Sequence, residues 1–278
     1  MPEFWTRVYG FTRQLAESIG QVLAEDAGRL TPELKADGSL VTAADKWADG
    51  KIRQAITKEF PEHGILSEET SHTLPSNDWC WVVDPIDGTT NFTRGLPLWA
   101  ISIGLLYQGT PIFGLVHLPQ LKQTFHGYWY GSSGIVGPSG AFLNHQPIQT
   151  TSDEPSPSHL FNLCARSTEI LNRPFSCKVR MVGVASYNIL LVAAGAAIGG
   201  IEASPKIWDI AAASVILQAA GGLLYHLEPN AIFPLTIGLD YGSRPFPSLA
   251  LSRPELRSFF EPQVAFIGER VRSTYRLS

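Results

Sequence analysis

The chain has 278 residues, of which 44% are hydrophobic and 17% are charged, and its formal net charge is −4. A chain of this length and composition can bury a full core in one large domain or two closely joined ones, which excludes a disordered or fibrous protein. Because a small negative charge is spread over a large surface, it provides no field that would attract nucleic acid.

The first half of the chain alternates between helical and strand patterns. Apolar residues at helical spacing predict a helix over residues 4–28 and a second one that begins after Thr42, its N-cap, and ends before Phe60. Short apolar runs separated by turn residues predict strands at 64–66, 79–83, 100–107 and 112–117. The glycine density over 127–140 predicts a surface hairpin or loop.

The second half follows a polar, proline-containing segment, 150–158, which we interpret as a linker. Beyond it the pattern predicts a strand at 159–164, a long small-residue helix at 186–200, an alanine-rich helix at 209–220 and mixed short segments. Gly195 and Gly199 would allow close packing of the long helix. We therefore expect an N-terminal part, 1–152, and a C-terminal part, 153–278, which form one functional unit with the site between them.

The cysteines and the hydropathy of the chain indicate in which cellular compartment the protein is expected. Cys80, Cys164 and Cys177 are odd in number and lack zinc-site or paired spacing, which indicates free thiols in a reducing cytoplasm. The first residues show no basic patch followed by an apolar run, so no secretory signal is expected. The uncharged stretch 181–201 reaches the length of a membrane span, but glycines and polar residues dilute it, so we expect a buried helix and no membrane partner.

The most informative stretch, 81–92, carries an apolar strand into two aspartates, Asp84 and Asp87. A proline between them fixes the backbone and Gly88 permits a sharp turn, so both carboxylates are expected in one pocket. The backbone N–H groups that follow would form an anion site. Carboxylates beside an anion site need cations between them, which predicts a hard divalent ion such as Mg²⁺. The alternative is an ordinary turn with solvated acids.

Other acids strengthen that prediction. Glu68 and Glu69 follow the strand predicted at 64–66, Asp45 lies three residues after Thr42, and Asp209 begins the alanine-rich helix. Each also has a simple structural explanation: a solvated pair, a capping box and a favourable helix dipole. All of these explanations together in one chain are much less probable than a shared site.

The segments 40–45, 68–69, 84–92 and 208–222 resemble, in residues and in order, the motifs of the inositol monophosphatase family, lithium-sensitive Mg²⁺-dependent phosphomonoesterases. Segment 140–148 is similar to the family's Gly-Ala-Phe-x-Asn-Gly-x-Pro hairpin. The chain departs from the family at Ser67, where glycine usually precedes the two glutamates, and at Ala219, where the family has Glu-Ala-Gly-Gly. These departures remove no candidate metal ligand, but they leave the substrate open.

The resemblance implies a layered α/β fold with alternating α-β-α-β-α layers, a homodimer and Mg²⁺ as cofactor. It implies that one Mg²⁺ is held by Glu68, Asp84 and the Ile86 carbonyl, a second by Asp84, Asp87 and Asp209, and a third, looser ion by Glu69. Thr89 and Asp45 would activate the attacking water, and the N–H groups of Gly88 and Thr89 would hold the phosphate. Glu202 would contact substrate hydroxyls, and Gly183 to Ala185 would form the facing wall.

The function that follows is Mg²⁺-dependent hydrolysis of a small phosphorylated polyol or sugar, with inositol monophosphate as the leading substrate. Fructose 1,6-bisphosphate, histidinol phosphate and 3′-phosphoadenosine 5′-phosphate are the alternatives, and Lys206, close to Asp209, would favour a bisphosphate. For Glu202 the alternative is a solvated loop residue. A different class, a regulatory or RNA-machinery binding protein on the same fold, predicts loss of the metal ligands, all of which are present.

Overall fold

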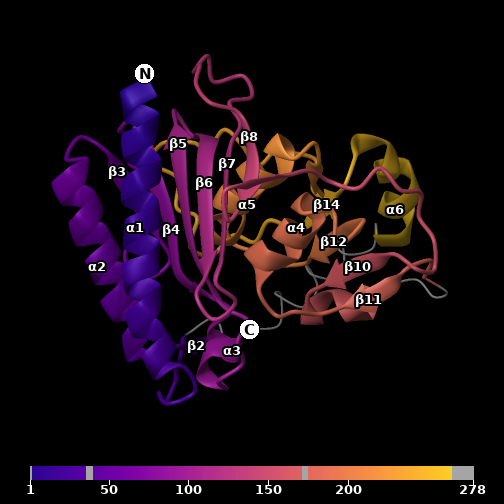
Figure 1. Ribbon diagram of the computed structural model, residues 1–278, viewed down its shortest axis with the longest axis horizontal. Helices are drawn as coiled ribbons and strands as arrows, with labels where there is room; N and C mark the ends of the chain where they lie inside the picture. The colour runs from indigo at the N-terminus through magenta and orange to yellow at the C-terminus, as the bar shows by residue number, and fades with distance from the viewer. Residues whose placement is uncertain (1, 36–39, 171–174, 265–278) are drawn as a thin grey trace.

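Layers of helices and sheets alternate across the molecule, as the computed structural model shows for residues 2–35, 40–170 and 175–264 (Figure 1). Helices α1 (Pro2–Asp26) and α2 (Ala43–Glu59) cover one face of a seven-stranded sheet, and α4 (Ala185–Ala193) and α5 (Ile207–Ala219) separate that sheet from a five-stranded one. Helix α6 (Arg257–Val264) covers the outer face of the second sheet. The α/β fold class and the α-β-α-β-α order expected from the sequence are confirmed.

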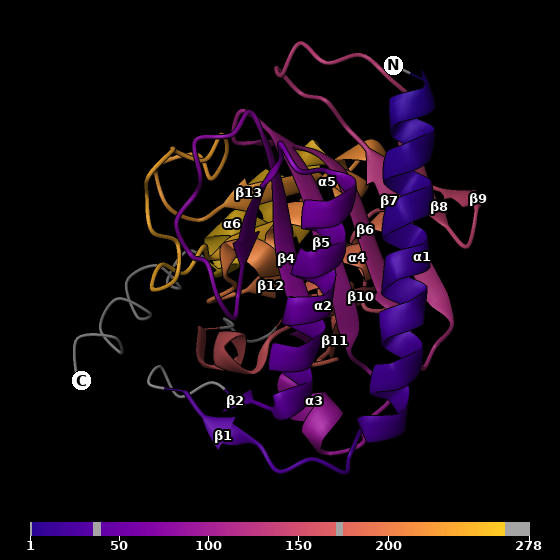
Figure 2. The ribbon, with the colours of Figure 1, turned by 90° about the vertical axis from the view of Figure 1, so that its left-hand side faces the viewer.

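The seven-stranded sheet has the order β3-β4-β5-β6-β7-β8-β9, with β3 parallel to β4 and the other neighbours antiparallel. Its strands are β3 (Gly64–Ser67), β4 (Trp79–Asp87), β5 (Ala100–Tyr107), β6 (Thr110–Leu118), β7 (Gln123–Tyr128), β8 (Gly140–Leu143) and β9 (Gln146–Ile148). Figure 2 shows α1 and α2 side by side in front of this sheet. Their apolar faces share one core with the strand residues that face them.

The five-stranded sheet has the order β11-β10-β12-β14-β13. Its strands are β10 (Leu160–Leu163), β11 (Lys178–Arg180), β12 (Gly199–Glu202), β13 (Leu223–His226) and β14 (Ser248–Leu251). Short elements complete the fold: β1 (Glu33–Leu34) paired with β2 (Leu40–Val41), helix α3 (Thr89–Thr93), and 3₁₀ turns at Ala165–Ile170 and Pro254–Leu256. The expected linker contains no helix or strand and joins the two sheets, while the boundary at residue 152 remains a prediction.

Helix α5 lies directly on the first sheet because glycines on two strands leave room for its backbone. A Cβ atom added at Gly114 on β6 would come within 2.2 Å of the Ala212 carbonyl oxygen. A Cβ at Gly104 on β5 would lie 3.2 Å from the Ala212 nitrogen. This close contact sets the position of the first turn of α5, which carries Asp209.

The long helix predicted over 186–200 is wrong in its second half. Helix α4 ends at Ala193, Gly195 follows with φ +72°, and Gly199 opens strand β12. The close helix packing predicted from Gly195 and Gly199 is therefore also wrong, and Gly199 lies against the Phe161 ring instead. A short apolar run that is buried on both faces looks the same in sequence whether it is a helix or a strand.

The other predicted helices and strands are present, although some begin or end at different residues. The two N-terminal helices and the four predicted strands of the first half are present, but β4 continues to Asp87 and β7 takes in the start of the region expected as loop. The three cysteines are free. Among the described residues, no helix combines the length and apolar character that a membrane crossing needs.

Candidate active site

Two buried aspartates end strand β4, and a β-bulge turns them to the same side. Asp84 is 1% exposed and Asp87 is 6% exposed. Asp84 pairs with Ser102 and Asp87 with Ala100, so three steps along β4 match two along β5. Residues three apart on a regular strand face opposite sides, and the extra residue of a bulge corrects this. The Ile86 N–H donates to Asp84 Oδ1 at 3.0 Å and fixes that side chain.

The third carboxylate arrives from the first turn of α5. Asp209 Oδ2 accepts a hydrogen bond from the Lys206 backbone N–H at 2.7 Å, which holds the carboxylate at the start of the helix. One carboxylate oxygen each from Asp84, Asp87 and Asp209 lie within 4.8 Å of one another. An all-oxygen donor set of this kind is what hard divalent cations such as Mg²⁺ prefer.

The electrostatics of the three carboxylates also fit a cation site. Burial, together with the negative charges of Glu68, Asp87 and Asp209, raises the pKa of Asp84 well above its usual range. Burial likewise raises the pKa of Asp87 to about 6, although N–H donors of Ser186 and Ala185 oppose the shift, and it raises the pKa of Asp209. Positive charge at this point would relieve the repulsion, so the residues present fit bound Mg²⁺.

Glu68 and Glu69 lie next to this cluster but are held by a lysine. Their carboxylates form ion pairs with the Lys35 ammonium at 2.7 and 2.6 Å. Burial and the Glu68 charge raise the pKa of Glu69 to about 7 against the opposing effect of Lys35. The Glu68 backbone N–H donates to Val83 on β4, so the turn that carries both glutamates is fixed beside the aspartates.

Asp45 takes part both in a helix capping box and in the candidate site, the two roles considered for it from the sequence. Its Oδ2 accepts hydrogen bonds from the Thr42 N–H at 2.7 Å and the Thr42 hydroxyl at 2.6 Å, which forms the capping box of α2. Its Oδ1 accepts the Thr89 hydroxyl at 3.3 Å, and the same hydroxyl lies 3.1 Å from the Ile86 carbonyl. One carboxylate thus caps a helix and orients the threonine that follows β4.

Gly88 is required at the turn between β4 and α3. Its φ of +91° lies in the left-handed region that favours glycine. A Cβ there would also come within 2.9 Å of the Val184 side chain and 3.2 Å of the Gly183 carbonyl. The turn brings the first N–H groups of α3, those near Thr89, to the side of the carboxylates, and such N–H groups have no partner earlier in their own helix.

The facing wall expected at 183–185 is fixed to the aspartate motif. The N–H groups of Ala185 and Ser186 donate to the two carboxylate oxygens of Asp87 at 3.1 and 2.7 Å. Asn91 donates to the carbonyls of Val182 at 2.8 Å and Leu98 at 2.9 Å. The sequence reasoning did not assign Asn91 a role, although it lies in the same motif.

Glu202 is a buried residue, not a solvated loop residue. It ends strand β12, is 6% exposed and accepts a hydrogen bond from the Asn188 side-chain amide of α4. Burial raises its pKa to about 8 even though the Asn188 bond opposes the shift. Lys206, the alternative phosphate contact, donates its ammonium to the Gly242 carbonyl at 2.8 Å.

Asp49 supports the two glutamates and was missed in the sequence. It lies one helical turn after Asp45 on α2, is buried, and accepts hydrogen bonds from the hydroxyls of Ser67 and Thr70. These hydroxyls flank Glu68 and Glu69, so Asp49 holds both ends of their turn. The i, i+4 spacing of two acids on one helix was the available signal.

Comparison with known proteins gives one family over most of the chain. Residues 5–253 match the inositol monophosphatase family. A fructose-1,6-bisphosphatase/inositol-1-monophosphatase of Aquifex aeolicus is 32% identical over 236 residues, which cover 79% of this chain and 86% of that protein. A histidinol-phosphatase of Chlorobaculum parvum is 30% identical, covering 76% and 83% of the two chains.

Two further likenesses bear on function and fold. A protein of Pasteurella multocida named Nus factor SuhB is 30% identical, with 75% of this chain and 81% of that protein covered. The solved structure of a Thermotoga maritima IMPase superposes with a TM-score of 0.77 at 25% identity, covering 96% of this chain and 98% of the other. The fold is therefore shared with the Thermotoga protein over nearly the whole of both chains.

Proposed function

Because the chain belongs to the inositol monophosphatase family and is a phosphoric monoester hydrolase of that family, we propose that it hydrolyses a small phosphorylated polyol with Mg²⁺ as its cofactor. The observation that carries the proposal is the convergence of Asp84, Asp87 and Asp209 beside the hydrogen-bonded pair of Thr89 and Asp45. These groups come from β4, α5, α3 and α2, and no structural need explains three clustered carboxylates, two of them buried, that repel one another.

The carboxylate cluster is the proposed metal site. Asp84, Asp87 and Asp209 would hold Mg²⁺ together with Glu68 and the Ile86 carbonyl, and Glu69 would help with a further ion. Mg²⁺ bound there would lower the pKa of water and neutralise charge on the phosphate and on the leaving oxygen. The Lys35 ammonium keeps the two glutamates paired when they hold no cation.

Asp45 and Thr89 are the proposed groups that orient the attacking water. The Thr89 hydroxyl donates toward Asp45 Oδ1, so its oxygen lone pairs are free to accept a hydrogen bond from water. The water proton can then pass along the pair to Asp45, whose pKa burial raises. The backbone N–H groups of Gly88 and Thr89 are the proposed phosphate donors.

Glu202 is proposed to hydrogen bond to the hydroxyls of the leaving group, and Gly183 and Ala185 are proposed to form the facing wall of the substrate site. Its burial and its bond from Asn188 give it a fixed orientation, as a hydroxyl-binding carboxyl needs. Inositol monophosphate is the proposed substrate, and the name of the Aquifex relative includes both it and fructose 1,6-bisphosphate. Fructose 1,6-bisphosphate, histidinol phosphate and 3′-phosphoadenosine 5′-phosphate are the competing substrates.

A regulatory role in the RNA machinery is the second candidate, and its support is the likeness to the Pasteurella protein named Nus factor SuhB. The intact acids favour catalysis over that role as the main function. A cytoplasmic location agrees with the three free cysteines. A homodimer is the proposed assembly, and light scattering on a sizing column measures it directly.

A phosphate-release screen tests the proposed function. The purified protein is given each of the four substrates with and without Mg²⁺, and Asp153→Asn, which changes an exposed acid in the segment that joins the two sheets, is the matched control. The proposal predicts Mg²⁺-dependent release that is fastest with inositol monophosphate and unchanged in the control. Full activity in excess chelator would overturn the metal assignment, and preference for another substrate would replace inositol.

A further inference from the structure

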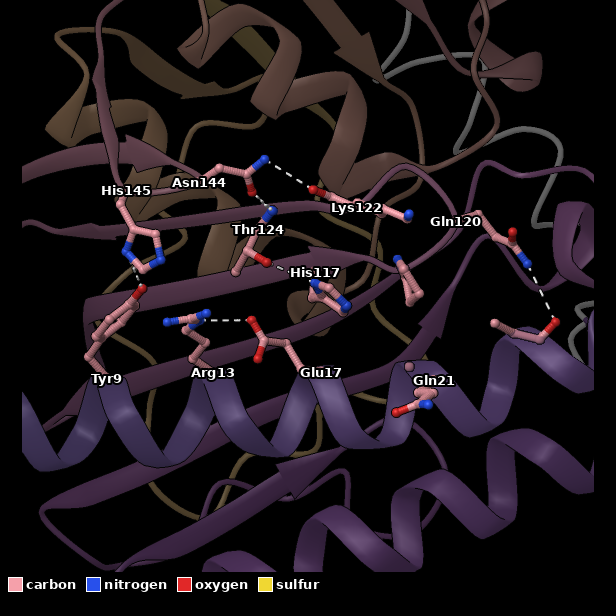
Figure 3. A pocket seen from close by; sticks show the side chains of 13 residues that line it. Tyr9, Arg13, Glu17, Gln21, His117, Gln120, Lys122, Thr124, Asn144 and His145 are labelled. Carbon is pink, nitrogen blue, oxygen red and sulfur yellow. Dashed lines mark hydrogen bonds and ion pairs between the residues drawn. The ribbon is translucent and has the colours of Figure 1, made fainter.

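The basic side chains that Figure 3 labels in the groove along α1 do not converge on one point. Arg13 is paired with Glu17 of its own helix at 2.8 Å, and the Lys122 ammonium is turned away from both Arg13 and His145. A binding site needs several groups fixed around the same point. The groove therefore contrasts with the turn after β3, where two charged side chains do converge.

The turn after β3, residues 67–71, brings two adjacent carboxylates together, and we call it the glutamate turn. Glu68 and Glu69 form ion pairs with the same Lys35 ammonium at 2.7 and 2.6 Å. Because adjacent side chains on an extended chain point to opposite sides, this convergence depends on the conformation of the turn. The ammonium marks the place where both carboxylates together can hold a positive charge.

Backbone hydrogen bonds close the glutamate turn and attach it to β4. The Ser67 N–H donates to the Ser71 carbonyl at 2.8 Å, and the Ser71 N–H donates back to the Ser67 carbonyl at 3.3 Å. The Glu68 N–H donates to the Val83 carbonyl at 3.2 Å, one residue before Asp84. These bonds place the turn beside the aspartates, and side chains of its first and fourth residues hold it further.

Asp49 of α2 holds the glutamate turn through two hydroxyl groups. Its Oδ1 accepts a hydrogen bond from the Ser67 hydroxyl, and its Oδ2 accepts one from the Thr70 hydroxyl at 2.9 Å. Arg53, one helical turn further along α2, also donates to the Thr70 hydroxyl oxygen. The two glutamates therefore lie between two residues that are anchored on the same buried carboxylate.

The bond between Ser67 and Asp49 is a costly feature that is particular to this chain. A buried carboxylate loses its hydration, and within the described part of the chain Asp49 forms no ion pair that would offset this loss. Glycine usually stands at the position of Ser67 in the family, and glycine has no hydroxyl to make the bond. The arrangement thus points to a role beyond folding of the turn.

We propose that Ser67 and Asp49 are positioning residues that keep Glu68 and Glu69 convergent and thereby set the affinity of the candidate site for Mg²⁺. The proposal rests on the proposed function, because it takes the two glutamates as Mg²⁺ ligands. Removal of the groups that orient metal ligands typically weakens metal binding by roughly 10- to 100-fold. An effect of this kind on Mg²⁺ affinity, without loss of a ligand, is what the two residues should show.

Isothermal titration calorimetry of Mg²⁺ into the metal-free protein tests the proposal. Asp49→Asn removes one acceptor oxygen at nearly constant size, Ser67→Ala removes the hydroxyl, and each should weaken Mg²⁺ binding at least about fivefold. Thr12→Ala, which removes a buried hydroxyl bonded within α1, should leave the affinity unchanged. Wild-type affinity in Asp49→Asn and Ser67→Ala would overturn the proposal alone, whereas absence of binding by the wild type would overturn the proposed function with it.

A double-mutant cycle separates positioning of the glutamates from a purely structural role. Glu69→Gln removes one of the two converging carboxylates, so in that background Asp49→Asn should weaken Mg²⁺ binding at most about twofold. The same loss of affinity in both backgrounds would show that Asp49 does not act through the glutamate turn. A lower melting temperature of Asp49→Asn with unchanged Mg²⁺ affinity would likewise assign it a structural role and overturn the proposal.

Discussion

The two regions that meet in the candidate active site are built in different ways. Asp84, Asp87 and Thr89 lie within six residues of one another, and a bulge and a glycine turn place them locally. Asp209 comes from α5, which packs on the first sheet, and Glu202 comes from β12 of the second sheet, which packs on α4, so only the packing of these layers brings the two residues to the same place. The first region is therefore readable from a short motif, while the second depends on the whole fold.

The two regions also differ in how their charges are satisfied. The aspartates of the first region repel one another and Asp209, so they need a cation. Glu202 in the second region is held by the Asn188 amide, and burial raises its pKa to about 8, so at neutral pH it keeps a proton in the metal-free protein. Substitutions of the clustered carboxylates, Asp209 included, should therefore affect catalysis, and substitution of Glu202 should affect substrate choice.

The largest effect is expected from Asp84→Asn. This change removes the charge at the centre of the cluster, so we expect kcat/KM to fall by about 10³-fold or more in saturating Mg²⁺. Phosphate release is the measurement, and Asp153→Asn should retain wild-type activity. Near-wild-type turnover in Asp84→Asn would contradict the account of the first region.

Thr89→Ala should have the next largest effect. Loss of the hydroxyl removes the group that links Asp45 to the water, so kcat should fall by about 10²-fold while Mg²⁺ binding persists. Thr89→Ser keeps the hydroxyl and should recover most of the activity. If Mg²⁺ binding were lost instead, Thr89 would be a structural residue of the turn.

Glu202→Gln should separate the second region from the first. If Glu202 reads hydroxyls, KM for a polyol phosphate should rise by a factor equivalent to about 1–3 kcal/mol, with an aryl phosphate hydrolysed nearly as before. Steady-state kinetics on both substrates measures the split. No change in Glu202→Gln, with selective loss of fructose 1,6-bisphosphate hydrolysis in Lys206→Ala, would favour a sugar bisphosphatase.

The stability of the metal-free protein should depend on pH through Asp87. Its folded pKa of about 6 lies above the ordinary value of 3.8, so the folded protein holds the Asp87 proton more tightly than the unfolded chain does. The free energy of unfolding is therefore highest below about pH 4, and it falls as the pH rises through 6. At about 1.4 kcal/mol for each pH unit, Asp87→Asn should gain about 3 kcal/mol over the wild type across this window. Urea unfolding at pH 4 and pH 7 measures it, and a constant difference would contradict the burial of this charge.

The site residues could be predicted from the sequence to the extent that local backbone determines them. The aspartates of β4 and the Thr42 cap follow from strand, turn and helix-start signals. The support of Glu68 and Glu69 by Asp49, and the contact of Ala185 and Ser186 with Asp87, join residues that are distant in sequence and leave no local trace. The end of α4 was misplaced because 189–200 consists only of apolar residues and glycines, which hides the change from helix to strand.

Mg²⁺ binding to the metal-free protein tests most directly the claim that both regions hold the same cations. Isothermal titration calorimetry at neutral pH compares the wild type with Asp209→Asn, which changes the second region's contribution to the cluster and leaves Asp84 and Asp87 in place. The account predicts that the wild type binds Mg²⁺ and that Asp209→Asn binds it at least about tenfold more weakly, a loss of about 1.4 kcal/mol. Equal affinity in the two proteins, or no binding by the wild type, would contradict it.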